Sequence, residues 1–279
     1  MPDMNVQIVT VELRRWLVEQ TQAGLSANAM LEGMLASGWK HQVALGALEE
    51  VQREAAHRVP AGQMPEPALQ DAATALQAGD REVQVVTAMK APRVVVFGGL
   101  LEPAECDELV ALARERLARS ETVTMVSGGS EVNPARTSEG MFFARGENAL
   151  VTRLEARIAA LLHWPVENGE GLQVLRYQPG SEYKPHYDYF DATQPGAASI
   201  LARGGQRVAS LVMYLNTPLR GGATTFPDVG LEVMPVRGNA VFFSYERPHP
   251  DTRTLHGGAP VLDGEKWVAT KWLRAGRFE

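Results

Sequence analysis

The sequence predicts a mainly β protein with supporting helices, preceded by a small helical segment at its N-terminus. Residues 6–58 carry apolar side chains at helical spacing, whereas short runs rich in Val, Phe and Tyr dominate beyond about residue 83. Turn-forming pairs such as Pro179-Gly180 separate these runs. Helices followed by many short strands with Gly/Pro turns are typical of a β-sandwich or barrel buttressed by helices.

Three short amphipathic segments near the N-terminus predict a small bundle. They span residues 11–20, 26–36 and 42–51, and the second begins with Ser26, a helix-capping residue. Their stripe of Leu, Met and Ala is typical of plain core packing, so we assign no chemistry to it.

A proline-rich stretch, residues 59–67, follows the bundle and predicts a linker, because it holds three prolines and one glycine. Residues 68–77 (ALQDAATALQ) predict a short helix. We therefore expect an N-terminal helical bundle over residues 1–60, a linker and short helix over 61–88, and a β-rich domain over 89–279.

The β-rich domain also has two predicted helices, residues 103–117 and 149–162, each with apolar residues at helical spacing. Short runs rich in β-branched and aromatic residues predict its strands. These runs are 83–86, 93–97, 172–177, 208–215, 223–226, 240–245 and 268–273.

Composition narrows the function classes. A net charge of −6 argues against a general nucleic-acid binder. The single cysteine, Cys106, excludes an intrachain disulfide and a zinc ribbon. The longest apolar run, residues 94–101, is far shorter than the ~20 residues of a membrane helix, and no signal-peptide pattern occurs. We expect a soluble, cytoplasmic protein with no membrane or nucleic-acid partner.

His186 and Asp188 form an H-x-D triplet. In a β-strand, residues two apart point to the same face, so an imidazole and a carboxylate would supply half of a divalent-metal site. The competing interpretation is a surface hydrogen-bonded pair. Of the remaining histidines, His256 is the better second ligand, because two glycines follow it, whereas His249 lies between two prolines in a loop.

Four segments resemble the prolyl 4-hydroxylase family of Fe(II)/2-oxoglutarate dioxygenases, and they occur in the family's order. The resemblance covers roughly residues 93–274, and residues 1 to about 88 have no recognised counterpart. The segments are LQVLRYQPGSEYKPHYDYF (172–190), GGQRVASLVMYL (204–215), GGATTFP (221–227) and LHGGAPVLDGEKWVATKWL (255–273).

This resemblance implies a double-stranded β-helix, or jelly-roll, core and a metal site made by His186, Asp188 and His256. The family places a lysine ten residues after the distal histidine, which is Lys266 here, whereas the same interval from His249 reaches an alanine. Two imidazoles and one carboxylate occupy one face of Fe(II) and leave three positions open. The lysine would bind the remote carboxylate of 2-oxoglutarate. The implied cofactors are Fe(II), 2-oxoglutarate and O2, with ascorbate as a candidate reductant.

The resemblance also suggests further contacts. Tyr177 and Trp272 match residues that lie beside 2-oxoglutarate and the iron, although core aromatic packing is the alternative for both. Glu170, Tyr183 and Arg207 match positions that line the substrate groove in some relatives, with solvated surface groups as the alternative.

The leading functional hypothesis is hydroxylation of prolyl residues in a peptide or protein, with decarboxylation of 2-oxoglutarate to succinate and CO2. Two loops, residues 126–134 and 191–205, are predicted to clamp that substrate. Hydroxylation of a free amino acid or small metabolite is a second hypothesis, with the helical bundle as an oligomerisation element, for example in a homodimer. A third is a catalytically silent module that binds a peptide or metal.

Overall fold

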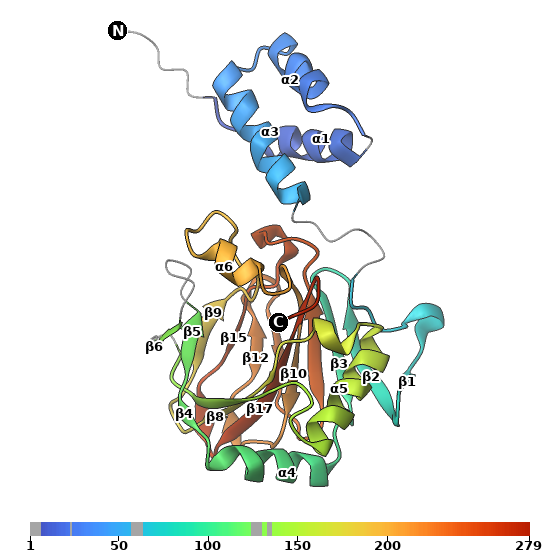
Figure 1. Cartoon of the computed structure of the whole chain (residues 1–279), viewed down its shortest axis with the longest axis vertical. Coiled ribbons are helices and arrows are strands. Elements are labelled where there is room, and N and C mark those ends of the chain that lie inside the picture. The colour runs from blue at the N-terminus through green and yellow to red at the C-terminus, as the bar shows by residue number, and fades with distance from the viewer. Residues whose placement is uncertain (1–6, 23, 57–63, 124–129, 133–135) are drawn as a thin grey trace. The chain divides into compact units, whose positions relative to one another are not determined.

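The computed structural model describes residues 7–22, 24–56, 64–123, 130–132 and 136–279. The chain divides into two compact units, Met1–Arg58 and Val59–Glu279 (Figure 1). Each unit has a hydrophobic core of its own. Among the described helices, none has the length and apolar character that crossing a membrane requires.

The N-terminal unit consists of the helices α1 (Val11–Gln22), α2 (Ala27–Ala36) and α3 (His41–Ala56), as predicted. The Ser26 hydroxyl accepts a hydrogen bond from the Ala29 amide and caps α2. The core of this unit holds Leu, Met, Ala and Val side chains from all three helices. They are Leu17, Met30, Met34, Ala44, Ala47, Leu48 and Val51.

A nine-stranded antiparallel sheet forms the frame of the larger unit (Figure 1). All of the strands predicted between residues 83 and 273 form here, except that the predicted run 223–226 belongs to a second sheet. In spatial order the nine strands are β1 (Ala75–Ala78), β2 (Arg81–Met89), β3 (Arg93–Gly98), β14 (Ala240–Ser244), β10 (Arg207–Tyr214), β17 (Lys266–Arg274), β8 (Leu172–Tyr177), β7 (Glu139–Phe143) and β4 (Ala118–Arg119).

A second, four-stranded sheet faces the inner side of the first sheet, and the apolar side chains of the two sheets share one core. This arrangement is the double-stranded β-helix that the sequence predicts. Two short ribbons complete the strands. In spatial order the four strands of the second sheet are β13 (Leu231–Val233), β12 (Thr224–Phe226), β15 (His256–Gly258) and β9 (Tyr183–His186). One ribbon pairs β11 (Arg220–Gly221) with β16 (Val261–Asp263), and the other pairs β5 (Glu121–Val123) with β6 (Ser130–Val132).

Helices α4 (Pro103–Arg114) and α5 (Ala149–Leu162) pack on the outer side of the large sheet. Strand β17 shows that both faces of this sheet are covered, since it is buried along its whole length. Trp267 and Ala269 join the core beneath the helices, whereas Val268 joins the core between the sheets. This alternation leaves Lys266 on the inner side, where the candidate site lies.

The predicted helix over residues 68–77 is wrong. The segment contains only a single 3₁₀ turn, Gln70–Ala72, after which Ala75–Ala78 pairs with β2 as strand β1. Gly79, with φ of +64°, makes the turn between these strands. Sheet pairing, which buries Ala78 completely, overrides the helical propensity of the Ala- and Leu-rich segment. The predicted start of the β-rich domain at residue 89 is therefore too late, because β1 and β2 belong to the large sheet.

Of the two predicted clamp loops, one falls largely outside the described residues. Only Ser130–Val132 of residues 126–134 is described, and it forms strand β6. The other loop, residues 191–205, contains a short helix, α6 (Ala197–Leu201). The clamp itself stays a prediction.

A fragment of residues 59–279 should fold and keep the metal affinity of the full chain, whereas a fragment of residues 82–279 should be less stable. The shorter fragment loses β1 and the side chains of Met64, Leu69 and Leu76, which pack on the core. Fully burying one such side chain is worth roughly 1.5–3 kcal/mol, so losing these three partly buried groups should cost on the order of 3 kcal/mol. Thermal unfolding of both fragments measures the difference, and equal melting temperatures would contradict the role given to residues 64–78.

Candidate metal and 2-oxoglutarate site

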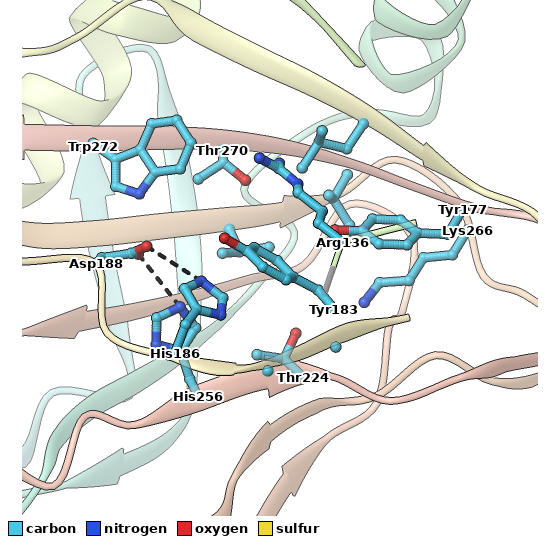
Figure 2. Close-up of a pocket in the computed structure, with 15 residues that line it drawn as sticks. Arg136, Tyr177, Tyr183, His186, Asp188, Thr224, His256, Lys266, Thr270 and Trp272 are labelled. Carbon is cyan, nitrogen blue, oxygen red and sulfur yellow. Dashed lines mark ion pairs between the residues drawn. The ribbon is translucent and has the colours of Figure 1, made fainter. Parts of the chain in front are cut away.

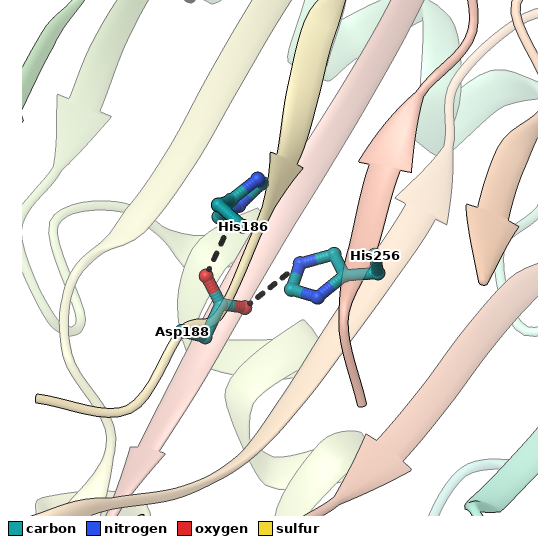
Figure 3. A group of neighbouring side chains, drawn as sticks. All are labelled: His186, Asp188 and His256. Carbon is teal, nitrogen blue, oxygen red and sulfur yellow. Dashed lines mark ion pairs between the residues drawn. The ribbon is translucent and has the colours of Figure 1, made fainter. Parts of the chain in front are cut away.

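Two histidines from distant parts of the chain meet through strand pairing. His186 at the end of β9 is the register partner of His256 at the start of β15, and the ring centroids are 4.4 Å apart (Figure 3). Each ring lies 2.9 Å, through Nδ1, from the carbonyl two residues earlier, Lys184 for His186 and Thr254 for His256. A carbonyl only accepts, so each Nδ1 carries the proton and each Nε2 keeps a lone pair for a metal.

Asp188 completes the group, but not as part of a strand. Strand β9 ends at His186, and Asp188 lies in the bend beyond it, which differs from the predicted i, i+2 strand geometry. Its Oδ1 is 3.5 Å from His186 Nε2 and its Oδ2 is 3.4 Å from His256 Nε2 (Figure 3). One potential ligand atom from each of the three residues lies within 4.8 Å of the others.

The protonation states of this group suit a metal. Burial by itself would raise the pKa of Asp188, but the electrostatic influence of the neighbouring His256 and His186 outweighs burial and holds the pKa well below its usual range. Burial, followed by the charge of His256, lowers the pKa of His186. A charged carboxylate beside a neutral imidazole is the combination that a divalent cation binds.

The donor set fits Fe(II). Two imidazole nitrogens and one carboxylate on one side of a pocket are the ligands of non-haem Fe(II) oxygenases. The rival ligand His249 lies elsewhere: its Nδ1 is 2.9 Å from Asp251, and it caps the turn Pro250–Thr252. The choice of His256 over His249 therefore agrees with the geometry.

Lys266 lies at the opposite end of the pocket from the three ligands (Figure 2). Its side chain is buried, and among the described residues no carboxylate pairs with it. Burial lowers the pKa of this ammonium to about 8. The rings of Tyr177 and Tyr214 lie 5.4 and 5.9 Å from Nζ, and the Tyr214 hydroxyl donates to Thr224, which also lines the pocket. A buried cation without a counter-ion is a site for an anionic ligand.

A glycine makes room for the lysine stem. Gly222 has φ of +75°, and a Cβ built there would lie 3.2 Å from Lys266 Cδ. Any side chain at this position would strain the backbone and press on the stem. The GGATTFP segment therefore shapes the lysine end of the pocket.

Tyr183 and Trp272 line the pocket near the three ligands (Figure 2). The Tyr183 ring stacks on His186 with centroids 3.7 Å apart, and burial raises the pKa of its phenol to about 12. The indole N–H of Trp272 is buried and has no hydrogen-bond partner in the part of the chain that the structure describes. Tyr183, predicted for the substrate groove, and Trp272, predicted to lie near the iron, therefore both line the pocket, together with Tyr177.

Glu170 and Arg207 lie behind the site rather than along the pocket wall. They form a buried, two-pronged ion pair with distances of 2.7 and 2.9 Å, and Glu170 also accepts from Arg274 at 2.6 Å. The Arg207 guanidinium stacks 4.1 Å from the Trp272 ring. Neither residue lines this pocket, and their charges pair with each other, so their place along a substrate groove stays a prediction.

Sequence reasoning gave no role to several pocket residues, namely Arg136, Thr224 and Thr270. Arg136 donates to Gln173 at 2.9 Å and its guanidinium lies 4.9 Å from the Tyr183 ring. Thr270 lies four residues beyond Lys266 on β17, so strand alternation alone places both on the inner side. That periodicity was available from the sequence.

Comparison with known proteins identifies relatives of this chain. Residues 172–274 match the model of the 2OG-Fe(II) oxygenase superfamily. The chain is 41% identical over 216 residues to prolyl 4-hydroxylase 1 of Arabidopsis thaliana, covering 71% of this chain and 74% of that protein. It is 39% identical over 211 residues to prolyl 4-hydroxylase 2 of the same plant, covering 67% and 69%. A viral collagen prolyl hydroxylase structure from Paramecium Bursaria Chlorella virus-1 aligns with a TM-score of 0.49 and 30% identity, over 65% of this chain and 95% of that one.

The fold, the three ligands and the superfamily match define a 2-oxoglutarate-dependent dioxygenase. The sequence identity to the two plant prolyl 4-hydroxylases identifies the family within this class of enzymes. The chain belongs to the prolyl 4-hydroxylase family of these enzymes.

Proposed function

We propose that this enzyme hydroxylates prolyl residues within a peptide or protein, converting 2-oxoglutarate and O2 to succinate and CO2. The observation that carries the proposal is the convergence of His186, Asp188, His256 and Lys266 on one pocket. The plant relatives are named as prolyl 4-hydroxylases, which supports the choice of substrate.

The chain's own residues bind and orient the reactants. His186, Asp188 and His256 would hold Fe(II), which with 2-oxoglutarate and O2 supplies an oxidant strong enough for an unactivated C–H bond. Lys266 would bind the remote carboxylate of 2-oxoglutarate at the far end of the pocket. Tyr183 and Trp272 add apolar walls that exclude water near the ligands.

The charges of the pocket favour a prolyl residue over free proline. Free proline carries an ammonium group, and the only carboxylate among the described pocket-lining residues is Asp188, which is needed by the metal. Binding a free amino acid would therefore leave its ammonium without a counter-ion in a buried place. A prolyl residue in a chain carries no such charge, and its rigid ring costs little entropy to order.

Proline-containing peptides should gain one oxygen atom in a reaction that needs the enzyme, Fe(II) and 2-oxoglutarate, and free L-proline should react much more slowly. Mass spectrometry measures the oxygen gain, and amino-acid analysis of the product identifies the hydroxyproline isomer. The matched control replaces each target proline by alanine.

Equal turnover of free proline and the peptides would favour the alternative of a small-metabolite hydroxylase. Absence of succinate with every substrate, while the protein still binds metal and peptide, would favour the silent binding module.

A further inference from the structure

The Asp188 ligand lies outside the sheet, so strand hydrogen bonds do not fix its position. Strand β9 ends at His186, and the bend that follows must be held by other groups. Side chains at the start of β10 hold it instead. The amide of Gln206 bonds to both the N–H and the carbonyl of Phe190, at 2.8 and 2.7 Å, and Arg207 lies 3.4 Å from the Asp188 carbonyl.

These contacts hold the backbone of the bend. Among the residues that the structure describes, one hydroxyl bonds directly to the carboxylate of Asp188. Ser210 Oγ lies 2.5 Å from Asp188 Oδ2, and Tyr245 OH lies 3.1 Å from Ser210 Oγ. Ser210 faces the inner side of β10, opposite Trp272 on β17, and is completely buried. A buried hydroxyl in this place cannot be replaced by water without a change in packing.

The direction of both hydrogen bonds follows from the chemistry of the groups. An ionised carboxylate only accepts, so Ser210 must donate its proton to Asp188. The Ser210 oxygen is then free to accept from the Tyr245 phenol. Burial raises the pKa of Tyr245 well above its ordinary value, so the phenol keeps the proton that it donates. The donor chain runs from Tyr245 through Ser210 to Asp188.

We propose that Ser210, supported by Tyr245, is a positioning residue that holds the Asp188 carboxylate toward the two imidazoles before a metal binds. The inference rests on the metal site of the proposed function. Without this bond the carboxylate could rotate about its side-chain torsions, and metal binding would have to restrict that freedom. Pre-orientation by a neighbouring donor is what makes groups beyond the ligands important for metal affinity.

Ser210→Ala should weaken Mn(II) binding to the full-length protein by about 10- to 100-fold, the usual cost of losing a group that orients a ligand. Ser210→Thr keeps a hydroxyl and should bind nearly as tightly as wild type. Tyr245→Phe keeps the hydrogen bond from Ser210 to Asp188 and removes only the phenol that bonds to Ser210. The Mn(II) affinity of this variant should therefore lie between those of wild type and Ser210→Ala. Titration calorimetry with Mn(II) measures all three variants without turnover.

A control distinguishes orientation from general destabilisation. Ser120 is also a buried serine, with its hydroxyl 3.0 Å from that of Ser138, and neither serine lines the pocket. Ser120→Ala should lower the melting temperature of the metal-free protein about as much as Ser210→Ala, but it should leave Mn(II) affinity unchanged.

Equal or tighter Mn(II) binding by Ser210→Ala, relative to wild type, would overturn the positioning role while leaving the proposed function intact. Equal weakening by Ser120→Ala would also overturn it, since the effect would then come from lost stability. Failure of the wild-type protein to bind Mn(II) would instead reject the metal site of the proposed function.

Discussion

Replacing His256 with alanine should lower metal affinity and succinate formation by more than about 100-fold. Loss of a group that merely orients a ligand costs 10- to 100-fold, so loss of the ligand itself should cost more. The buried Asp188 carboxylate would also lose one of the two imidazoles that hold its pKa down. Mn(II) titration and a succinate assay measure the two effects separately.

His249→Ala is the matched control for this substitution. His249 accepts from the Asp251 amide and caps a surface turn, so its loss should cost about 1 kcal/mol of stability without changing metal affinity. The reverse result, with His249→Ala inactive and His256→Ala active, would mean that the distal ligand has been assigned to the wrong histidine.

Most of the β-rich fold could be predicted because its strands are buried on both faces. Runs such as residues 240–243 (AVFF) are continuously apolar, and β14 is buried at every position. The segment 68–77 failed for the opposite reason. Its Ala, Leu and Gln residues favour a helix locally, and only pairing with β2 makes Ala75–Ala78 a strand. Pairing between segments is not encoded in local composition.

The grouping of the three candidate metal ligands could be predicted because their types and spacings are specific, but the side chains that support them could not. The hydroxyl of Ser210 reaches Asp188 only because β10 passes beside the bend after β9, a relation that depends on the register of the sheet. The groove assignments of Glu170 and Arg207 stay predictions, and the sequence did not indicate that these two charges pair with each other. A charge's partner in space decides whether it can bind substrate.

Two cations on strands β17 and β8 differ from Lys266 in having carboxylate partners, which favours Lys266 as the proposed anion site. Lys271, on the outer side of the same strand, forms a buried ion pair with Glu155 at 2.5 Å. Arg176, on the neighbouring strand β8, pairs with Glu265. Both cations are therefore neutralised within the fold, whereas Lys266 has no carboxylate partner among the described residues.

Lys266→Ala should weaken 2-oxoglutarate binding by roughly 10- to 150-fold at pH 7, because a charge-assisted hydrogen bond is worth about 1.5–3 kcal/mol. Mn(II) affinity should stay nearly the same, since Lys266 lies at the opposite end of the pocket from the ligands (Figure 2). Calorimetry with the Mn(II)-loaded protein measures the dissociation constant. Unchanged affinity for 2-oxoglutarate would place its remote carboxylate elsewhere.

The same lysine should make 2-oxoglutarate binding depend on pH. Burial lowers the pKa of Lys266 to about 8, so the empty pocket holds an ammonium below pH 8 and a neutral amine above it. The dicarboxylate binds the ammonium form more tightly, so affinity should be level below pH 8 and fall above it, with uptake of a proton on binding at pH 9. Calorimetry in buffers of different ionisation enthalpy counts that proton.

Lys266→Arg should remove both the proton uptake and the decline in 2-oxoglutarate affinity, because a guanidinium stays charged throughout this pH range. Binding by the wild-type protein that is level to pH 9.5 and takes up no proton would show that the lysine is not the anion's partner.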